Sequence, residues 1–275
     1  MSAPASPVEF FATVPPPPLD RFVESIWAVR GAGSYDRSAV LPNGAIQLML
    51  NFGAAHRVVA FGERRVEQPY RTAWIAGLQD APLEIAAPPL TDLVSVRFRP
   101  GGAHAFLPLP PAALSHDVID AKEVLGPAAT SLRDRVGEAA TRSAQVEAVV
   151  GWLRARLRPR EHDFLLIERA VALLAARQPG ESVSVTCERL GVSNRHLIAL
   201  FRNLVGLPPK TFARVARFHC ALARLPGAPS RSALAHQLGY ADQAHFNHEF
   251  RRLAGVTPGA FVARRGEDHE SIIVA

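Results

Sequence analysis

Cysteine is scarce in this chain of 275 residues, which contains only Cys187 and Cys220. Neither belongs to a CxxC pair, so the sequence gives little support to a disulfide framework or a structural zinc site. Both are expected to be small buried residues of helices. The histidines His56, His104 and His116 lack the HxH spacing of a metal-binding cupin. We therefore expect no bound metal.

Long apolar runs are also missing. No stretch approaches the roughly 20 residues that a membrane helix needs. The first seven residues, MSAPASP, have neither the basic residues nor the apolar segment of a secretory signal. We therefore expect a cytoplasmic protein that does not enter the membrane.

Common enzyme motifs are absent as well. The sequence has no GxSxG elbow and no GxxxxGK phosphate loop, and neither cysteine has the sequence context of a nucleophile. The sequence thus predicts a protein that is not an enzyme and that has no cofactor.

The net charge of +6 is unevenly distributed. Residues 163–265 carry a net charge of +8, whereas the rest of the chain carries −2. A basic domain joined to a near-neutral one is typical of a nucleic-acid binder with an attached second domain, because cations that neutralise phosphates supply most of the non-specific affinity. Charge by itself fits RNA as well as DNA.

Short strand-like stretches organise the first half of the chain. Residues 1–18 end in four consecutive prolines and are expected to be a flexible lead-in. Helical spacing appears only later, at 125–136 and 145–157. This order predicts a small β-sandwich or barrel closed by helices. The predicted strands are rich in valine, isoleucine and phenylalanine, and the first of them could begin as a helix; they are 22–29, 45–52, 57–61, 73–76, 83–86 and 92–98.

An all-α domain is predicted to follow. Pro159 disfavours helix in the residue before it, which places a boundary near residue 160 and makes Glu161 and His162 a short linker. The next segment is helical, beginning with 164–176 and stopping at 178–180. The sequence therefore predicts an α+β protein of two domains. Its divisions are a lead-in at 1–18, a β-rich domain at 19–160, a helical domain at 163–265 and a tail at 266–275.

An internal repeat occupies the helical domain. Leu190-Gly191 returns as Leu238-Gly239, and a glycine after a short helix allows a left-handed turn into a second helix. The repeat therefore predicts two helix-turn-helix units. At a spacing of 49 residues, further pairs match: His196 and His245, Phe201 and Phe250, Arg202 and Arg251, Gly206 and Gly255, Pro209 and Pro258, and Phe212 and Phe261.

The second helix of each unit is expected to have a buried face and an exposed one. Apolar residues recur at helical spacing within 194–204 and within 242–253. The outward residues of the later helix suit base recognition, because Gln and Asn can bond adenine edges. An ordinary solvated face is the competing interpretation, which two copies of the whole unit make less favourable. The predicted inner residues are Leu197, Leu200, Phe201, Leu204, Phe246, Phe250 and Leu253.

These motifs resemble the DNA-binding domain of the AraC family of bacterial transcriptional regulators. The resemblance rests on LGVSNRHL, LFR and GLPP within 190–209, and on LAHQLGYADQAHF, EFRR and GVTPGAF within 234–261. It implies a long connecting helix, from residue 209 or 210 to about 225, that presents both reading helices to successive major grooves. The base contacts that it implies are Arg195, Ile198, Ala199, Gln243, Ala244, Asn247 and His248. Phosphate contacts are expected from Arg202, Asn203, Arg251 and Arg252.

The first unit departs from the usual family pattern. Ile198 and Ala199 stand where the family often has polar or basic residues. The first unit is therefore expected to read thymine methyl groups or DNA shape more than hydrogen-bonding edges.

The N-terminal region resembles, less specifically, the small β-rich effector domains of AraC-type regulators. The resemblance rests on LDRFVESIW at 19–27, LPNG at 41–44 and VRFRPGG at 96–102. Such domains sense a small molecule, pair two subunits, or do both. Trp27, Arg97 and Arg99 are candidates for a pocket that holds an anionic or aromatic ligand, although a structural role near a sheet edge explains the arginines as well.

The partner implied by the resemblance is double-stranded DNA. A small-molecule effector, RNA polymerase and a second copy of the chain are further candidates. A non-regulatory architectural DNA binder, or a partner-binding module on the same scaffold, is the alternative function.

Overall fold

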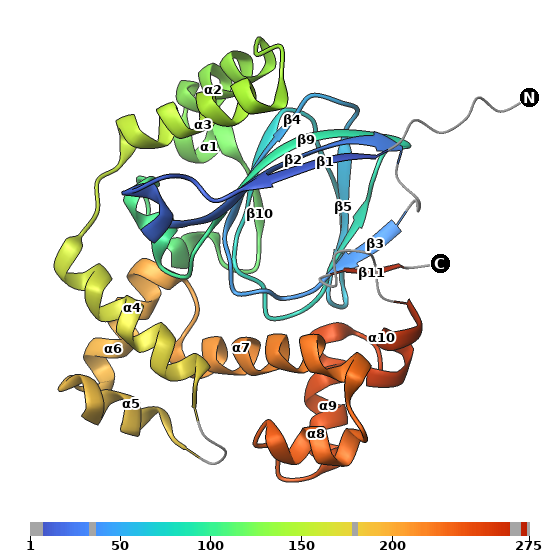
Figure 1. Cartoon of the computed structure of the whole chain (residues 1–275), viewed down its shortest axis with the longest axis vertical. Coiled ribbons are helices and arrows are strands. Elements are labelled where there is room, and N and C mark those ends of the chain that lie inside the picture. The colour runs from blue at the N-terminus through green and yellow to red at the C-terminus, as the bar shows by residue number, and fades with distance from the viewer. Residues whose placement is uncertain (1–7, 33–36, 178–180, 265–270, 274–275) are drawn as a thin grey trace, which may run out of the picture.

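The computed structural model describes residues 8–32, 37–177, 181–264 and 271–273. A β-rich N-terminal domain precedes a helical C-terminal domain (Figure 1), which is the two-domain α+β class that the sequence predicts. Within these ranges, no helix has the length and apolar character to cross a bilayer. The predicted helix stop at 178–180 lies outside the described residues.

Two antiparallel sheets form the N-terminal domain, and they do not close into a barrel. Of the two alternatives that the sequence leaves open, the structure is therefore the sandwich. The larger sheet has the order β1-β2-β9-β4-β7-β10, formed by Glu9–Thr13, Val23–Ala32, Leu90–Phe98, Gln47–Asn51, Ala73–Ala76 and Val118–Asp120. The smaller has the order β11-β3-β8-β5-β6, formed by Ser271–Ile273, Arg37–Val40, Leu83–Ala86, His56–Phe61 and Arg64–Tyr70.

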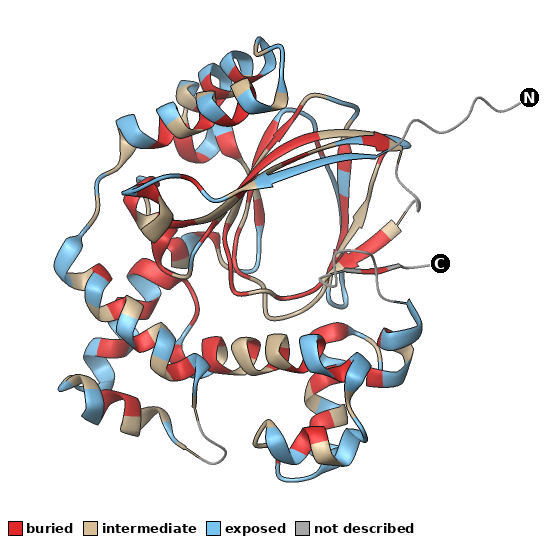
Figure 2. Cartoon of the chain, in the orientation of Figure 1, coloured by how far each residue is buried: buried red, intermediate tan, exposed pale blue. Residues whose placement is uncertain are grey.

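Alternation along the strands of the larger sheet gives it two different apolar faces. Ile26, Leu48 and Val96 lie on the helix-covered face and are almost completely buried. Trp27 and Met49, one position further along their strands, lie on the face between the sheets and are only half-buried. The edge strand β1 is exposed along most of its length, as its pale blue colour in Figure 2 shows. The helix-covered face packs against α1 (Ala121–Leu125), α2 (Pro127–Gly137) and α3 (Arg142–Arg156).

The C-terminal domain is built around one connecting helix, α7, which lies beside the sandwich with a helix pair at each end (Figure 1). The predicted connector and its flanking pairs are therefore present. The described helices of this domain are α4 (Glu161–Ala175), α5 (Val183–Leu190), α6 (Asn194–Leu200), α7 (Pro209–Arg224), α8 (Arg231–Gln237), α9 (Gln243–Ala254) and α10 (Pro258–Arg264). A π-helical turn, Phe201–Val205, extends α6.

The two domains share an apolar interface. The ring of Phe22 stacks on that of Phe164 in α4, with centroids 4.4 Å apart, and both side chains are fully buried. At the rim, Arg21 forms ion pairs with Glu161 at 3.3 Å and with Glu168 at 2.9 Å. One apolar cluster thus extends from the helix-covered face of the sandwich into the helical domain. The sequence predicts two domains, and the packing between them is visible only in the folded chain.

Three predicted segments differ from the structure. The flexible lead-in contains the edge strand β1, because Glu9–Thr13 pairs with β2 before the run of prolines begins. The predicted linker, Glu161 and His162, forms the first turn of α4. In the predicted tail, Ser271–Ile273 pairs with β3, because Ile272 is buried against the sheet.

Candidate nucleic-acid interface

The first helix-turn-helix unit consists of α5 and α6. The helix α5 ends at Gly191, whose φ of +67° lies in the left-handed region. Ser193 then begins α6 by accepting a hydrogen bond from the backbone N–H of His196 at 3.2 Å. The buried ring of Phe201 lies 5.7 Å from that of Phe212 in α7. The turn is therefore tight, and the inner face of the reading helix packs on the connector.

The second unit repeats this construction with α8 and α9. Ser230 and Asp242 each accept a hydrogen bond from a backbone N–H three residues further on, at 3.1 Å and 2.7 Å. Gly239, with φ of +77°, provides the turn between the helices. Phe250 is fully buried, and its ring lies 5.2 Å from that of Phe218 and 5.7 Å from those of Phe246 and Phe261. An aromatic cluster thus holds α9 in place.

Arg217 of α7 contacts the turn of the second unit. Its guanidinium carbon lies 4.5 Å from the ring centroid of Tyr240, and the side chain donates to the carbonyl of Gly239 at 3.3 Å. It also pairs with Glu249 at 3.5 Å. Burial raises the pKa of Tyr240 to about 12, so the phenol stays neutral and its ring can take part in the cation–π contact. The connecting helix thereby sets the orientation of the second turn.

The predicted DNA-contacting side chains form an exposed ridge on each reading helix. On α6 and its π-helical turn, the exposed residues are Arg195, Ile198, Ala199, Arg202 and Asn203; on α9, they are Gln243, Ala244, His248, Arg251 and Arg252. A helix that follows a tight turn and carries such a ridge can enter a major groove, which is about 12 Å wide.

Asn247 is the exception among the predicted base contacts. Its side chain is half-buried, and its Oδ1 is buried without a hydrogen-bond partner. An unpaired buried acceptor destabilises the free protein. A rotation of this side chain toward a partner would remove that penalty.

The three candidate effector residues do not lie together. The register of β2 and β9 puts Trp27 and Arg97 on the same face, between the two sheets. Arg97 pairs there with Glu24 at 3.2 Å, and its side chain is 15% exposed. Arg99 follows the end of β9 and donates instead to the carbonyl of Asp20 at 2.7 Å, in an exposed position. Only Trp27 and Arg97 therefore face the space between the sheets.

The sequence patterns do not reveal the side chains that position the reading helices against the sandwich. Asp80 pairs with Arg214 of α7 at 3.4 Å. The hydroxyl of Ser115 donates to the carbonyl of Gly206, at the end of the first reading helix, at 2.8 Å. These pairs are separated by 134 and 91 residues, so no local periodicity marks them.

Among the described residues, no group of three or more His, Cys, Asp or Glu side chains is placed to hold a metal ion.

Comparisons with known proteins divide the chain in two. Residues 186–264 match the family model described as a helix-turn-helix domain, and residues 12–120 match a family described as a domain of unknown function, DUF6597. None of the curated proteins is similar enough to match.

Solved structures with similarity to the chain include complete regulators and isolated domains. ToxT from Vibrio cholerae has 8% identity and a TM-score of 0.48, and the match covers 92% of this chain and 98% of ToxT. A transcriptional regulator from Chromobacterium violaceum with an AraC-type DNA-binding domain has 24% identity and a TM-score of 0.36, covering 39% of this chain and 98% of that one. The C-terminal domain of AraT from Geobacillus stearothermophilus has 21% identity and a TM-score of 0.34, covering 36% and 84%.

The two helix-turn-helix units joined by one helix thus agree with the family model that matches residues 186–264, and they follow a β-rich N-terminal domain.

Proposed function

We propose that the chain is a transcriptional regulator of the AraC family, which recognises a specific DNA sequence with α6 and α9. The main support for this proposal is the duplicated unit. Each copy has the same glycine turn, a capped reading helix, a buried inner face and an exposed ridge. The proposed base contacts are Arg195, Ile198, Ala199, Gln243, Ala244, Asn247 and His248. The proposed phosphate contacts are Arg202, Asn203, Arg251 and Arg252.

Substitution of Asn247 is the most direct test of base recognition. A base edge in the major groove would supply the partner that its buried Oδ1 lacks in the free protein. Turning this side chain toward an adenine thus gains two hydrogen bonds and removes an unpaired acceptor. The amide of a base-reading asparagine contributes about 1–3 kcal/mol of discrimination against the wrong base.

The test begins with selection of bound duplexes from a random pool by the full chain. Asn247→Ala should weaken binding to the selected site by about 1–3 kcal/mol and relax the preference at one or two base pairs. Arg251→Ala should weaken all sequences alike and reduce the salt slope by about 1. Arg224→Ala is the matched control, because Arg224 is exposed at the end of α7, outside both ridges.

Two results would contradict this proposal. The first is a selection that enriches no sequence, which would favour an architectural DNA binder or a partner-binding module. The second is an equal loss for Asn247→Ala on selected and random DNA, which would assign Asn247 no role in sequence recognition.

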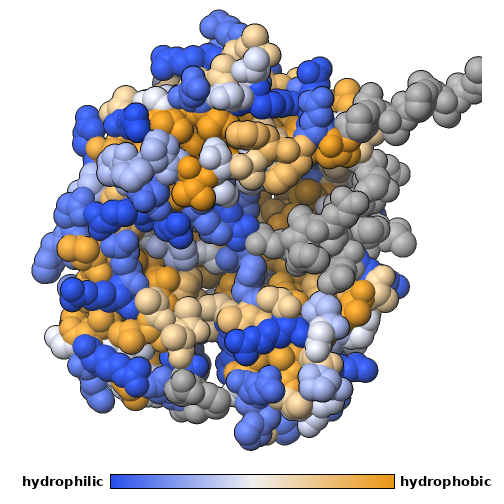
Figure 3. Space-filling model, viewed as in Figure 1, coloured by the Kyte–Doolittle hydropathy of each residue, from blue (hydrophilic) through white to orange (hydrophobic). Residues whose placement is uncertain are grey.

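We further propose that the N-terminal domain binds a small-molecule effector between its sheets. Support comes from incomplete packing: Trp27, Met49 and Phe61 belong to the apolar cluster between the sheets yet remain half-buried. In the space-filling view, apolar residues surround a recess beside the strands of the sandwich (Figure 3). Arg97 offers a cation at the same face, which suits an anionic or aromatic ligand.

Repeating the DNA selection with candidate metabolites tests the effector proposal. Trp27→Ala and Arg97→Gln should remove any response to an active metabolite while the protein still binds its DNA site. A response that survives both substitutions would exclude the space between the sheets as the effector site.

The remaining parts of the proposal rest on the family resemblance. They are self-association through the N-terminal domain, contact with RNA polymerase, a cytoplasmic location, and a division of the chain near residue 160. Footprinting on a defined promoter site would separate a regulator from an architectural protein.

A further inference from the structure

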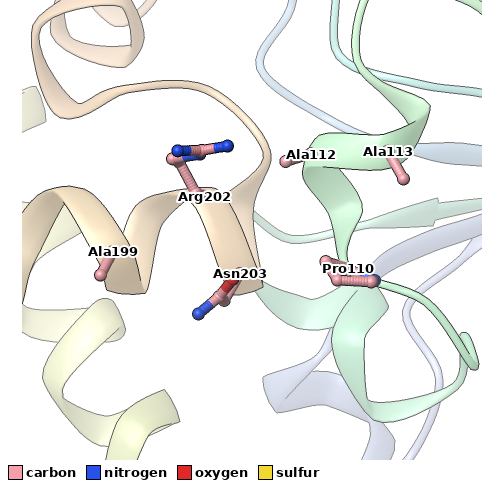
Figure 4. A pocket seen from close by; sticks show the side chains of 6 residues that line it. All are labelled: Pro110, Ala112, Ala113, Ala199, Arg202 and Asn203. Carbon is pink, nitrogen blue, oxygen red and sulfur yellow. The ribbon is translucent and has the colours of Figure 1, made fainter.

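A cleft separates the first reading helix from the N-terminal domain (Figure 4). Its volume is about 430 Å³, within the range of about 300–1,000 Å³ typical of small-molecule sites. One wall is formed by Ala199, Arg202 and Asn203, and the other by Pro110, Ala112 and Ala113. In Figure 4, the guanidinium of Arg202 extends over the gap in the direction of Ala112.

The cleft continues toward the segment that joins the domains. A smaller hollow of about 200 Å³ shares Pro110 and Asn203 with it and reaches His104, Leu107 and Arg160. Together, the two hollows place two guanidinium groups and one carboxamide around a surface of prolines, alanines and leucines.

The charged side chains that line the two hollows are positive. Arg202 and Arg160 are exposed arginines, and none of the described residues that line the two hollows is acidic. His104 contributes no charge, since its Nε2 accepts the backbone N–H of Arg160 at 3.2 Å and burial lowers its pKa. A guanidinium group such as that of Arg202 matches a phosphate, which it can bind through bidentate hydrogen bonds.

The two walls are held at a fixed separation. The hydroxyl of Ser115 donates to the carbonyl of Gly206 at 2.8 Å, just beyond the residues of the reading helix that line the cleft. A Cβ built at Gly206 would lie only 3.1 Å from the carbonyl oxygen of Pro111, so the helix end and the proline wall are in close contact. Because the site is largely preformed, a ligand would lose little free energy in ordering it.

We propose that this cleft binds a small organic phosphate, with its phosphate group on Arg202 and Asn203 and its apolar body against Pro110 and Ala113. The bound ligand and DNA compete for the first unit, because Arg202 is also a proposed phosphate contact. By linkage, each lowers the affinity for the other by the same factor. The competition with DNA rests on the proposed function, whereas binding of the organic phosphate does not.

The first experiment is titration calorimetry of the full chain with phenyl phosphate, in the absence of DNA. Inorganic phosphate and phenol are the matched probes, because each carries only one part of the ligand. Phenyl phosphate should bind saturably at one site and more tightly than either probe. Arg202→Gln should weaken binding at least about tenfold through loss of a charge-assisted contact.

Variants separate the cleft from other sites. Ala113→Trp fills the cleft from the exposed opposite wall and should abolish binding, while Arg224→Gln should leave it unchanged. Absence of saturable binding would overturn the proposal. So would equal binding by the Arg202→Gln protein, or loss of binding in the Arg224→Gln protein.

The second experiment measures affinity for the selected DNA site with and without phenyl phosphate at constant ionic strength. Affinity should fall for the natural chain and stay constant for Ala113→Trp. A fall of equal size in both proteins would overturn the competition. If no DNA site is selected, the proposed function fails while calorimetry still decides the ligand site.

Discussion

Gly206 and Gly255 occupy equivalent positions in the repeat, yet the structure predicts very different responses to alanine. At Gly255, φ is +73°, and an added Cβ would lie 3.4 Å from Cγ of Pro82, an ordinary contact. At Gly206, φ is +111°, and the Cβ would lie 2.9 Å from Oγ of Ser115 and 3.1 Å from the carbonyl oxygen of Pro111. Gly206 is thus restricted both by its backbone and by the opposite domain.

The expected free-energy losses follow from these two restrictions. Alanine in the left-handed region costs about 1–2 kcal/mol, which is the whole loss expected for Gly255→Ala. At Gly206, where φ of +111° lies far from the centre of the left-handed region, the backbone of alanine costs about 1–3 kcal/mol, and forcing a methyl group into a packed site adds about 1–3 kcal/mol. Gly206→Ala should therefore cost about 2–6 kcal/mol, a large part of the roughly 5–15 kcal/mol that stabilises a folded protein.

Urea unfolding followed by far-ultraviolet circular dichroism measures both variants under identical conditions. The midpoint should fall much further for Gly206→Ala than for Gly255→Ala, with Gly255→Ala serving as the matched control for the glycine repeat. Equal losses would refute the close contact between the first unit and the N-terminal domain, and with it the fixed width of the cleft.

Three further perturbations test the buried parts of the molecule. Phe250→Ala should cost about 3–5 kcal/mol because the ring is fully buried among other aromatic rings; an unchanged thermal midpoint would contradict this packing. Phe164→Ala should cost a similar amount in urea unfolding, whereas Arg21→Ala should cost at most about 1 kcal/mol because its ion pairs are exposed; the reverse order would mean that charge holds the domains together. Burial lowers the pKa of His56 to about 4, below its usual 6.5. The unfolded chain therefore binds the proton more tightly, and stability should fall by up to about 3 kcal/mol as the pH drops from 6.5 toward 4, with a shallower slope in His56→Gln.

Much of the local structure follows from residue patterns. The strands at 73–76 and 83–86 have the bounds that the sequence predicts, because apolar β-formers there stand between turn residues. The connecting helix also lies where the resemblance places it, at Pro209–Arg224. The inner faces of both reading helices are buried, as their spacing predicts.

Other strands carry no such pattern. The strand β6, Arg64–Tyr70, is mostly exposed and lacks apolar alternation, so only its pairing with β5 makes it a strand. Likewise β11, Ser271–Ile273, is paired with β3 from more than two hundred residues away. A strand of this kind forms because a partner strand lies beside it, and the local residue pattern does not reveal that partner.

The two helix-turn-helix units follow from residue patterns, since the spacing of a few glycines, caps and apolar residues is enough to predict which face of each reading helix is buried. How those units meet the sandwich depends on contacts that exist only in the folded chain: Phe22 on Phe164, Ser115 on Gly206, and a cleft lined from both domains. The periodicity of apolar residues predicts that a side chain will be buried. It does not predict which residue that side chain packs against, because this depends on the shape and polarity of surfaces that meet only after the chain has folded.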